Sequence, residues 1–95
     1  MAWEELEPEE RAVLCALHRI VGRATGRKPR HAPIGQVMRK LAPPLRDTAT
    51  VRGALRRLAR LGLARRVKGR GGERETWTLT PEGARLAEEK CLELE

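Results

Sequence analysis

The sequence is short of several residue types on which enzymes commonly depend. Its 95 residues include no serine, asparagine, tyrosine or phenylalanine, one aspartate (Asp47) and one glutamine (Gln36). A serine nucleophile is therefore excluded, and a catalytic triad or carboxylate pair has few residues from which to form. No nucleophile–base constellation is visible, so the sequence indicates a protein that is not an enzyme and that has no cofactor. Because Trp3 and Trp77 are the only aromatic residues, the core must be aliphatic.

Long apolar runs and cysteines are also scarce. No stretch approaches the roughly 18 apolar residues of a membrane span, and the acidic N-terminal segment is unlike the basic start of a signal peptide. We therefore expect a cytoplasmic protein without a membrane partner. The two cysteines, Cys15 and Cys91, are too few for a disulfide framework. A zinc site needs about four ligands, and besides His18 only the distant His31 remains, so we expect buried thiols and no metal.

Charge is unevenly distributed along what should be a single domain. The formal net charge is +7, yet residues 1–10 hold five glutamates and no base, and residues 81–95 hold five glutamates against two bases. The segment 11–80 therefore contains 18 basic residues and three acidic ones. A basic centre between acidic ends predicts a surface that binds a polyanion. The alternative is a solvated, arginine-rich surface without a partner.

Hydrophobic spacing predicts two helices in the first half of the chain. The first spans residues 7–22, with Pro8 at its start, where proline is favoured. Its inward stripe consists of Val13, Leu14, Ala16, Leu17, Ile20 and Val21. The second helix spans residues 33–41 and is terminated by Pro43 and Pro44.

The connection between these helices, residues 22–33, is rich in glycine, proline and basic residues. Its cations are Arg23, Arg27, Lys28, Arg30 and His31. A long loop of this kind either contacts phosphate groups or is simply solvated, and both readings stay open.

A third helix, residues 48–61, has the most informative pattern. Asp47, Thr48 and Thr50 are alternative N-caps, and Gly62 suits the C-terminal cap. One arc of the helix is apolar and consists of Val51, Ala54, Leu55, Leu58 and Leu61. The opposite arc consists of Ala49, Arg52, Gly53, Arg56 and Arg60, with Arg57 at its edge. This helix is therefore predicted to pack one face in the core and to present guanidinium groups beside small residues on the other.

A hairpin and a last helix complete the predicted elements. The hairpin spans residues 63–79, with the glycine-rich KGRGG segment at its tip. Its return strand is expected to place Glu75, Trp77 and Leu79 on one face and Thr76 and Thr78 on the other. Trp77 should belong to the core rather than stack on a nucleic-acid base. Thr80 followed by Pro81 then indicates the start of a helix over residues 81–94.

The segment LRRLARLGLARRVKGRGGERETWTLTPEGARLAE resembles the recognition helix, wing and following helix of bacterial winged-helix transcription regulators of the MarR and PadR type. The shared features are Leu58, Leu61-Gly62-Leu63, a basic wing, and Leu79-Thr80-Pro81-Glu82-Gly83 at the start of a helix. The segment GRKPRHAPIGQVMRKL is loosely similar to the first part of LexA-like winged domains. The resemblance is good over residues 48–90 and weak back to about residue 10.

The resemblance implies a mostly α fold with a small β-hairpin. This is a winged helix-turn-helix with a three-helix core, a two-stranded wing and a C-terminal helix, in one domain over residues 1–95. Two features depart from the pattern. The turn between the second and third helices contains two prolines, and the long extra helices with which full MarR-type regulators dimerise and bind effectors are absent. We therefore expect no small-molecule effector.

In such a fold the third helix enters the major groove, and the wing reaches the minor groove or the backbone. Arg52 and Arg56 are the candidates for base contact, because a bidentate arginine–guanine pair is the commonest specific contact. Gln36 alone can read adenine in the equivalent way, so a guanine-containing site is expected. Gly53 would allow close approach of the helix to DNA. The remaining expected contacts, mainly to phosphates, are Arg39, Lys40, Thr48, Thr50, Arg57, Arg60, Lys68 and Arg70.

The expected function is sequence-specific binding of double-stranded DNA by a small transcription regulator. A homodimer formed through the terminal segments would explain why these are acidic and partly apolar. Two alternatives remain at this stage. One is a winged-helix protein-interaction or accessory module with non-specific binding to DNA or RNA, and the other is an RNA-binding winged helix.

Overall fold

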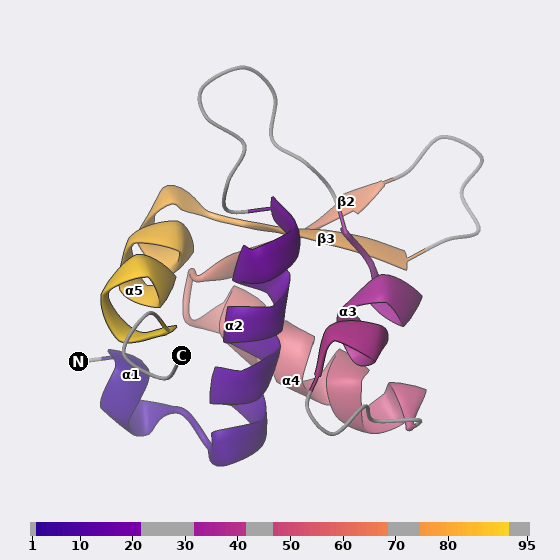
Figure 1. Cartoon of the computed structure of the whole chain (residues 1–95), viewed down its shortest axis with the longest axis horizontal. Coiled ribbons are helices and arrows are strands. Elements are labelled where there is room, and N and C mark those ends of the chain that lie inside the picture. The colour runs from indigo at the N-terminus through magenta and orange to yellow at the C-terminus, as the bar shows by residue number, and fades with distance from the viewer. Residues whose placement is uncertain (1, 22–31, 42–46, 69–74, 92–95) are drawn as a thin grey trace.

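A computed structural model of the chain describes residues 2–21, 32–41, 47–68 and 75–91 (Figure 1). The elements in order are α1 (Ala2–Glu5), α2 (Pro8–Val21), β1 (Ala32–Pro33), α3 (Ile34–Lys40), α4 (Thr48–Arg60), β2 (Ala64–Lys68), β3 (Glu75–Leu79) and α5 (Pro81–Cys91). The predicted fold class, a mostly helical winged helix-turn-helix with a small sheet, is confirmed. None of the described helices is long and apolar enough to cross a membrane.

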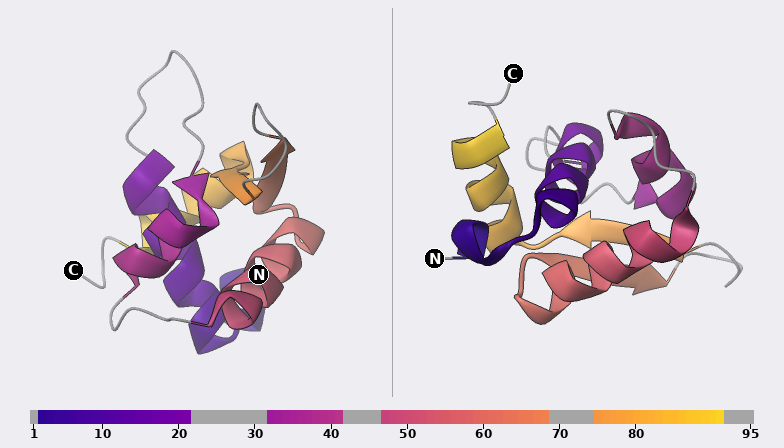
Figure 2. Two further views of the ribbon diagram at one scale, coloured as in Figure 1. Left: turned by 90° about the vertical axis from the view of Figure 1, so that its right-hand side faces the viewer. Right: turned by 90° about the horizontal axis from the view of Figure 1, so that it is seen from below.

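The helix α2 lies at the centre of the molecule, with α3, α4 and α5 packed around it (Figures 1 and 2). The backbone N–H of Glu7 donates to Oε1 of Glu10 at 2.9 Å, which satisfies an amide at the helix start in the manner of a capping box. The predicted inward stripe is buried apart from Ile20, which is only partly covered. The prediction of a helix over 7–22 is therefore correct to within one residue at the start, and residue 22 lies outside the described part.

A short helix, α1, precedes α2 and folds back against it. The Nε–H of Arg11 donates to the carbonyl oxygen of Trp3 at 3.0 Å, and the Arg11 guanidinium lies 5.2 Å from the centre of the Trp3 ring. Leu6, between the two helices, belongs to the buried core. Four residues are too few to show a helical period, which is why the sequence pattern does not predict α1.

In the described part of the chain the sheet has three antiparallel strands in the order β1-β3-β2. The two predicted strands of the wing are β2 and β3, and β1 is a third strand that the sequence did not predict. The added strand pairs Ala32 with Trp77 and Pro33 with Thr76. Pro33 therefore belongs to β1, and the helix predicted from residue 33 begins at Ile34. A proline is tolerated here because β1 is an edge strand, where a missing N–H need not break a ladder.

The return strand of the hairpin and the last helix are described over residues 75–79 and 81–91. Thr76 and Thr78 were predicted to share the face of β3 opposite Trp77, and Thr78 is buried, so this second face is covered as well. The helix predicted over 81–94 is described from Pro81 to Cys91, and the residues beyond Cys91 lie outside the described part of the chain.

A dense set of backbone contacts joins the end of α4 to the start of α5. Gly62 has a φ of 77°, and the amides of Gly62 and Leu63 donate to the carbonyls of Ala59 and Leu58, which is a Schellman cap. The Thr80 hydroxyl donates to the Gly62 carbonyl at 2.6 Å and accepts from the Gly83 amide at 3.0 Å. The base of the wing and the start of α5 are therefore held by the same few residues.

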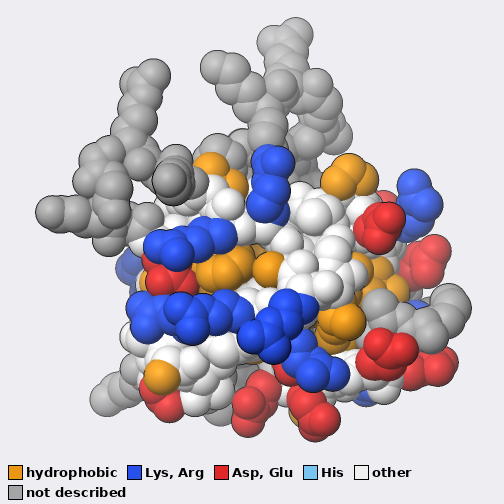
Figure 3. Space-filling view, turned by 180° about the vertical axis from the view of Figure 1, so that it is seen from behind, with side chains coloured by type: hydrophobic (Ala, Val, Ile, Leu, Met, Phe, Trp, Pro, Cys, Tyr) orange, Lys and Arg blue, Asp and Glu red, His pale blue; other side chains and the backbone are white. Residues whose placement is uncertain are grey.

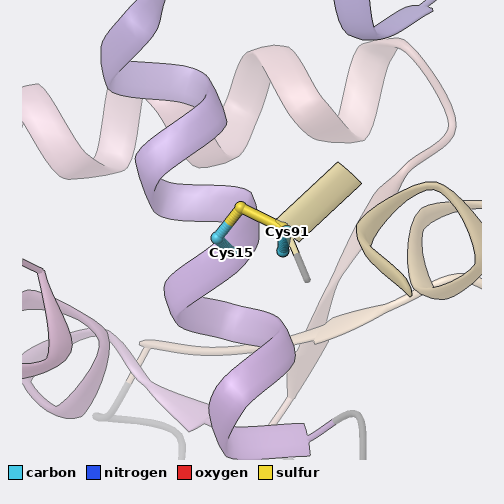
Figure 4. Close-up of a disulfide and its surroundings, with 2 residues drawn as sticks. All are labelled: Cys15 and Cys91. Carbon is cyan, nitrogen blue, oxygen red and sulfur yellow. A yellow bond between two sulfur atoms is a disulfide. The ribbon is translucent and has the colours of Figure 1, made fainter. Parts of the chain in front are cut away.

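The two cysteines form a disulfide, so the expectation of free buried thiols was wrong. The bond joins the middle of α2 to the last residue of α5, with the Cα atoms of Cys15 and Cys91 separated by 5.6 Å (Figure 4). Both residues are buried, as expected. They are 76 positions apart in sequence, and only the packing of α5 against α2 brings them together.

Candidate nucleic-acid interface

The helix α4 begins at Asp47, the first of the three candidate caps. Its side chain accepts from the Ala49 amide at 3.0 Å and from the Thr50 hydroxyl at 2.6 Å. These bonds favour the charged carboxylate. The Thr50 hydroxyl, more than the backbone amides of Ala49 and Thr50, lowers the pKa of Asp47 below its ordinary value. The same bonds engage Thr50, and Thr48 directs its hydroxyl to Sδ of Met38 at 3.7 Å.

Acid should therefore weaken the start of α4. Because the pKa of Asp47 is lower in the folded chain, its contribution to stability is complete above the ordinary pKa of about 4 and disappears as pH falls through the folded value. We expect wild type to be more stable than Asp47→Asn at neutral pH, and the difference to close below about pH 4. Urea unfolding measured from pH 7 to pH 3 tests this. A difference between the two proteins that does not change with pH would contradict it.

An exposed arc of α4 lies between two arginines that are tied to other parts of the chain. On one side, Nε of Arg52 lies 2.8 Å from Oε1 of Glu75 on β3. On the other side, Nε of Arg57 lies 3.2 Å from Oε1 of Glu10 on α2. The exposed residues between them are Ala49, Gly53, Arg56 and Arg60. A β-carbon on Gly53 would meet no atom within 4 Å, so the backbone here is open to a partner.

A groove runs from this arc toward the wing. It has a volume of about 700 Å³ and lies between the β1–α3 junction, α4 and the hairpin. The residues that line it are Pro33, Ile34, Gly35, Gln36, Arg39, Arg52, Arg66 and Glu75. Three arginines from three different elements therefore meet at one groove. In the space-filling view from behind Figure 1, Lys and Arg side chains form a band across the molecule (Figure 3).

Sequence reasoning missed Arg66. In the hairpin register Arg66 pairs with Trp77, so both lie on the face of the sheet that also carries Glu75. Arg66 is exposed, since β2 is the other edge strand of the sheet. The alternation of β3 already placed Glu75 and Trp77 on one face. Arg66 could be assigned to the same face only once the register of the hairpin was known.

The other predicted contact residues are distributed as follows. Arg39 and Lys40 are exposed at the end of α3, and Nε of Arg39 donates to the Gly35 carbonyl at 3.4 Å. Lys68 ends β2, where its backbone pairs with Glu75. Arg70, the KGRGG tip beyond Lys68, the cations of residues 22–31 and the two-proline turn lie outside the described residues. In the described part of the chain, no group of three His, Cys, Asp or Glu residues is placed to hold a metal ion.

A second hollow lies where α1, α2, the end of α3 and the end of α5 meet. It has a volume of about 390 Å³. Its lining residues are Trp3, Pro8, Arg11, Ala12, Cys15, Ala16, Arg19, Lys40, Leu41 and Cys91. Both halves of the disulfide are among the residues that line this hollow.

No protein-family profile and no curated protein matches the chain. Solved structures do. A Pseudomonas aeruginosa protein classed as a transcriptional regulator aligns with 92% of this chain and 57% of its own, at 27% identity and a TM-score of 0.69. Bordetella bronchiseptica BpsR, whose DNA binding is regulated by 6-hydroxynicotinic acid, aligns with 93% of this chain and 58% of its own, at 30% identity and a TM-score of 0.68.

A Ralstonia eutropha protein classed as DNA-binding aligns with 88% of this chain and 95% of its own, at 27% identity and a TM-score of 0.67. The present chain therefore spans less than three fifths of the first two proteins and the bulk of the third. These structural neighbours are transcriptional regulators or DNA-binding proteins, and none is described as an enzyme. They support a regulatory DNA-binding role for this fold.

Proposed function

We propose that the chain binds double-stranded DNA sequence-specifically, as the winged-helix unit of a transcription regulator of the MarR or PadR type. In this proposal α4 enters the major groove and the β2–β3 wing contacts the minor groove or the backbone. The observation that carries the proposal is the exposed arc of α4, where Arg56 and Arg60 stand beside open backbone at Gly53 and next to the three-arginine groove. Bordetella bronchiseptica BpsR, a protein with regulated DNA binding, shares the fold at 30% identity.

The described contacts sort the expected DNA-binding residues into two groups. Arg56 and Arg60 are exposed and make no hydrogen bond or ion pair with a described residue. Arg52, Arg57 and Thr50 already have partners in Glu75, Glu10 and Asp47. We propose base contact for Arg52 and Arg56. The proposed phosphate contacts are Arg39, Lys40, Thr48, Thr50, Arg57, Arg60, Arg66, Lys68 and Arg70.

In vitro selection from random duplex DNA, followed by binding measurements at two salt concentrations, tests the proposal. Seven of the nine proposed phosphate contacts are Lys or Arg side chains, so affinity should fall roughly 10³-fold or more between about 50 and 200 mM salt. Arg56→Ala should reduce the preference for the selected site over an unrelated duplex by roughly tenfold, because one bidentate base contact is lost. A flat salt response of the wild type would contradict DNA binding.

Arg19→Ala is the matched control, since Arg19 is an exposed arginine on α2, outside the proposed DNA interface and outside the helices proposed to pair. It removes the same charge as Arg56→Ala and should leave the preference unchanged. A selected site made only of A·T pairs would contradict the proposed arginine–guanine contacts. Tighter binding to structured RNA than to duplex DNA would favour an RNA-binding function.

We also propose that two copies pair through the terminal helices. The helices α1 and α5 lie together on one side of the molecule, with α3 on the opposite side (Figures 1 and 2). Two copies related by a two-fold axis would read two inverted half-sites. The centres of these half-sites would be about 34 Å apart, which is one turn of the DNA helix, or a multiple of this distance. The selection experiment therefore reports on pairing, because a single asymmetric site bound by a monomer would contradict it.

A further inference from the structure

Glu75 is the acidic residue in a groove that otherwise carries arginines. Its side chain is only 14% exposed, and it shares the groove with Arg39, Arg52 and Arg66. A carboxylate in this position repels phosphate groups, so it weakens the attraction of the groove for DNA of any sequence. A surface that only needed to attract a polyanion would be better served by a neutral residue.

The two oxygens of Glu75 accept from two different donors. Oε1 accepts from Nε of Arg52 at 2.8 Å, and Oε2 accepts from Nε1 of Trp77 at 3.1 Å. Trp77 is 2% exposed and belongs to the core. The core therefore holds the indole, the indole orients the carboxylate, and the carboxylate orients the guanidinium on α4.

This arrangement leaves the outer edge of the Arg52 guanidinium for a partner. The bond to Glu75 uses Nε, and Arg52 makes no other hydrogen bond with a described residue. The terminal NH₂ groups of arginine form the fork that matches the O6 and N7 acceptors of guanine. A side chain that is already oriented loses less rotamer freedom when it binds, so the gain from a correct base is larger.

We propose that Glu75 is a specificity-determining residue. It holds Arg52 in the orientation that reads guanine, and its charge lowers the affinity for DNA that lacks the correct base. Arg56, one turn along the same arc, has no such partner among the described residues and serves as an internal comparison. This inference rests on the proposed DNA-binding function.

Glu75→Gln is the informative substitution, because glutamine has nearly the same shape but only one acceptor oxygen. Arg52 and Trp77 both donate, so an amide at position 75 cannot satisfy both, and its NH₂ group must face one of them. Glu88→Gln is the matched control. It makes the same change in net charge at an exposed position on α5, outside the groove. The duplexes carry a single half-site, so that pairing of two copies through α5 does not enter the comparison.

The experiment compares the duplex selected by the wild type with duplexes in which one guanine at a time is replaced by 7-deazaguanine, which lacks the N7 acceptor. In the wild type, substitution of the guanine read by Arg52 should weaken binding by roughly tenfold. In Glu75→Gln that loss should shrink to about threefold or less, while binding to an unrelated duplex is as tight as in the wild type or tighter. Glu88→Gln should retain the full loss.

A spectroscopic readout shows whether the contact itself has changed. The indole N–H resonance of Trp77 should move in Glu75→Gln, while that of Trp3, which lies on α1, should stay in place. Thermal unfolding of the same variant establishes that it is folded at the temperature of the binding assay.

The outcomes separate the two proposals. Wild-type discrimination at every guanine in Glu75→Gln, or an equal reduction in Glu88→Gln, would each overturn the role of Glu75 and leave the proposed function intact. A wild type that binds all duplexes equally would overturn sequence-specific binding, and the role of Glu75 with it. A wild type that binds no duplex DNA would overturn the proposed function, and the role of Glu75 with it. Lost discrimination in Glu75→Gln alone supports the inference.

Discussion

Replacing Gly83 by alanine should lower the free energy of unfolding by about 3 kcal/mol or more, because the new methyl group has no room. A β-carbon at Gly83 would lie 1.8 Å from the carbonyl oxygen of Leu63 and 2.8 Å from its carbonyl carbon. The obstacle is backbone rather than a flexible side chain, so relief requires the start of α5 to move away from the base of the wing. For a domain of this size the expected fall in Tm is roughly 10–20 °C.

Circular dichroism during thermal unfolding measures this change, and Gly53→Ala provides the control. Gly53 lies inside α4, and a β-carbon there would meet nothing within 4 Å. Alanine at this position should raise stability by about 0.5–1 kcal/mol, because it restricts the unfolded chain and suits a helix interior. Equal Tm values for Gly83→Ala and wild type would show that α5 does not pack this closely on Leu63.

Reducing the Cys15–Cys91 disulfide should cost the folded protein about 4 kcal/mol. The bond joins positions 76 apart in sequence, and the loss of conformational freedom in the unfolded chain sets the size of the effect. Unfolding by urea with and without a reductant measures it.

The control for this prediction is the double variant Cys15→Ala with Cys91→Ala. It should be less stable than the oxidised wild type, and its unfolding should not respond to the reductant. Thiol alkylation of the wild type without reduction should label neither cysteine. Labelling of both, or an unfolding curve that the reductant leaves unchanged, would contradict the bond. Since disulfides persist only where thiols are oxidised, the redox state of the surroundings decides which form of the protein is present.

The wing contains both contacts that stabilise the fold and contacts that belong to the proposed site. Gly83 and Thr80 hold the base of the wing against α5, and Glu75 and Trp77 link its return strand to α4. A variant that loosens the first set of contacts should therefore be tested for folding before any change in DNA binding is assigned to the second set. Glu75→Gln and Gly83→Ala separate these effects, since the first alters a hydrogen bond at the groove and the second alters backbone packing.

Local features of the sequence determined which elements form and which side of each faces inward. The spacing of Val51, Ala54, Leu55 and Leu58 predicts the buried face of α4, and the same spacing puts Arg56 and Arg60 on the exposed arc. Gly62 predicts the end of that helix, because only glycine readily adopts its positive φ. These inferences succeed because a helical period and a cap each depend on residues close together in the chain.

Tertiary structure alone decided which distant residues meet. The pairing of β1 with β3, the bond between Cys15 and Cys91, and the contact of Glu75 with Arg52 join positions that no local period relates. The close approach at Gly83 is of the same kind, since nothing in the helix itself requires a glycine there. The sequence by itself therefore determined a basic winged helix with an arginine-bearing α4. The sequence could not go further for a physical reason. The spacing of side chains along a helix or strand specifies which face is buried, but only the packing of one element on another specifies which residues of the two elements touch. Those contacts decide which arginines are held by a carboxylate and which are exposed.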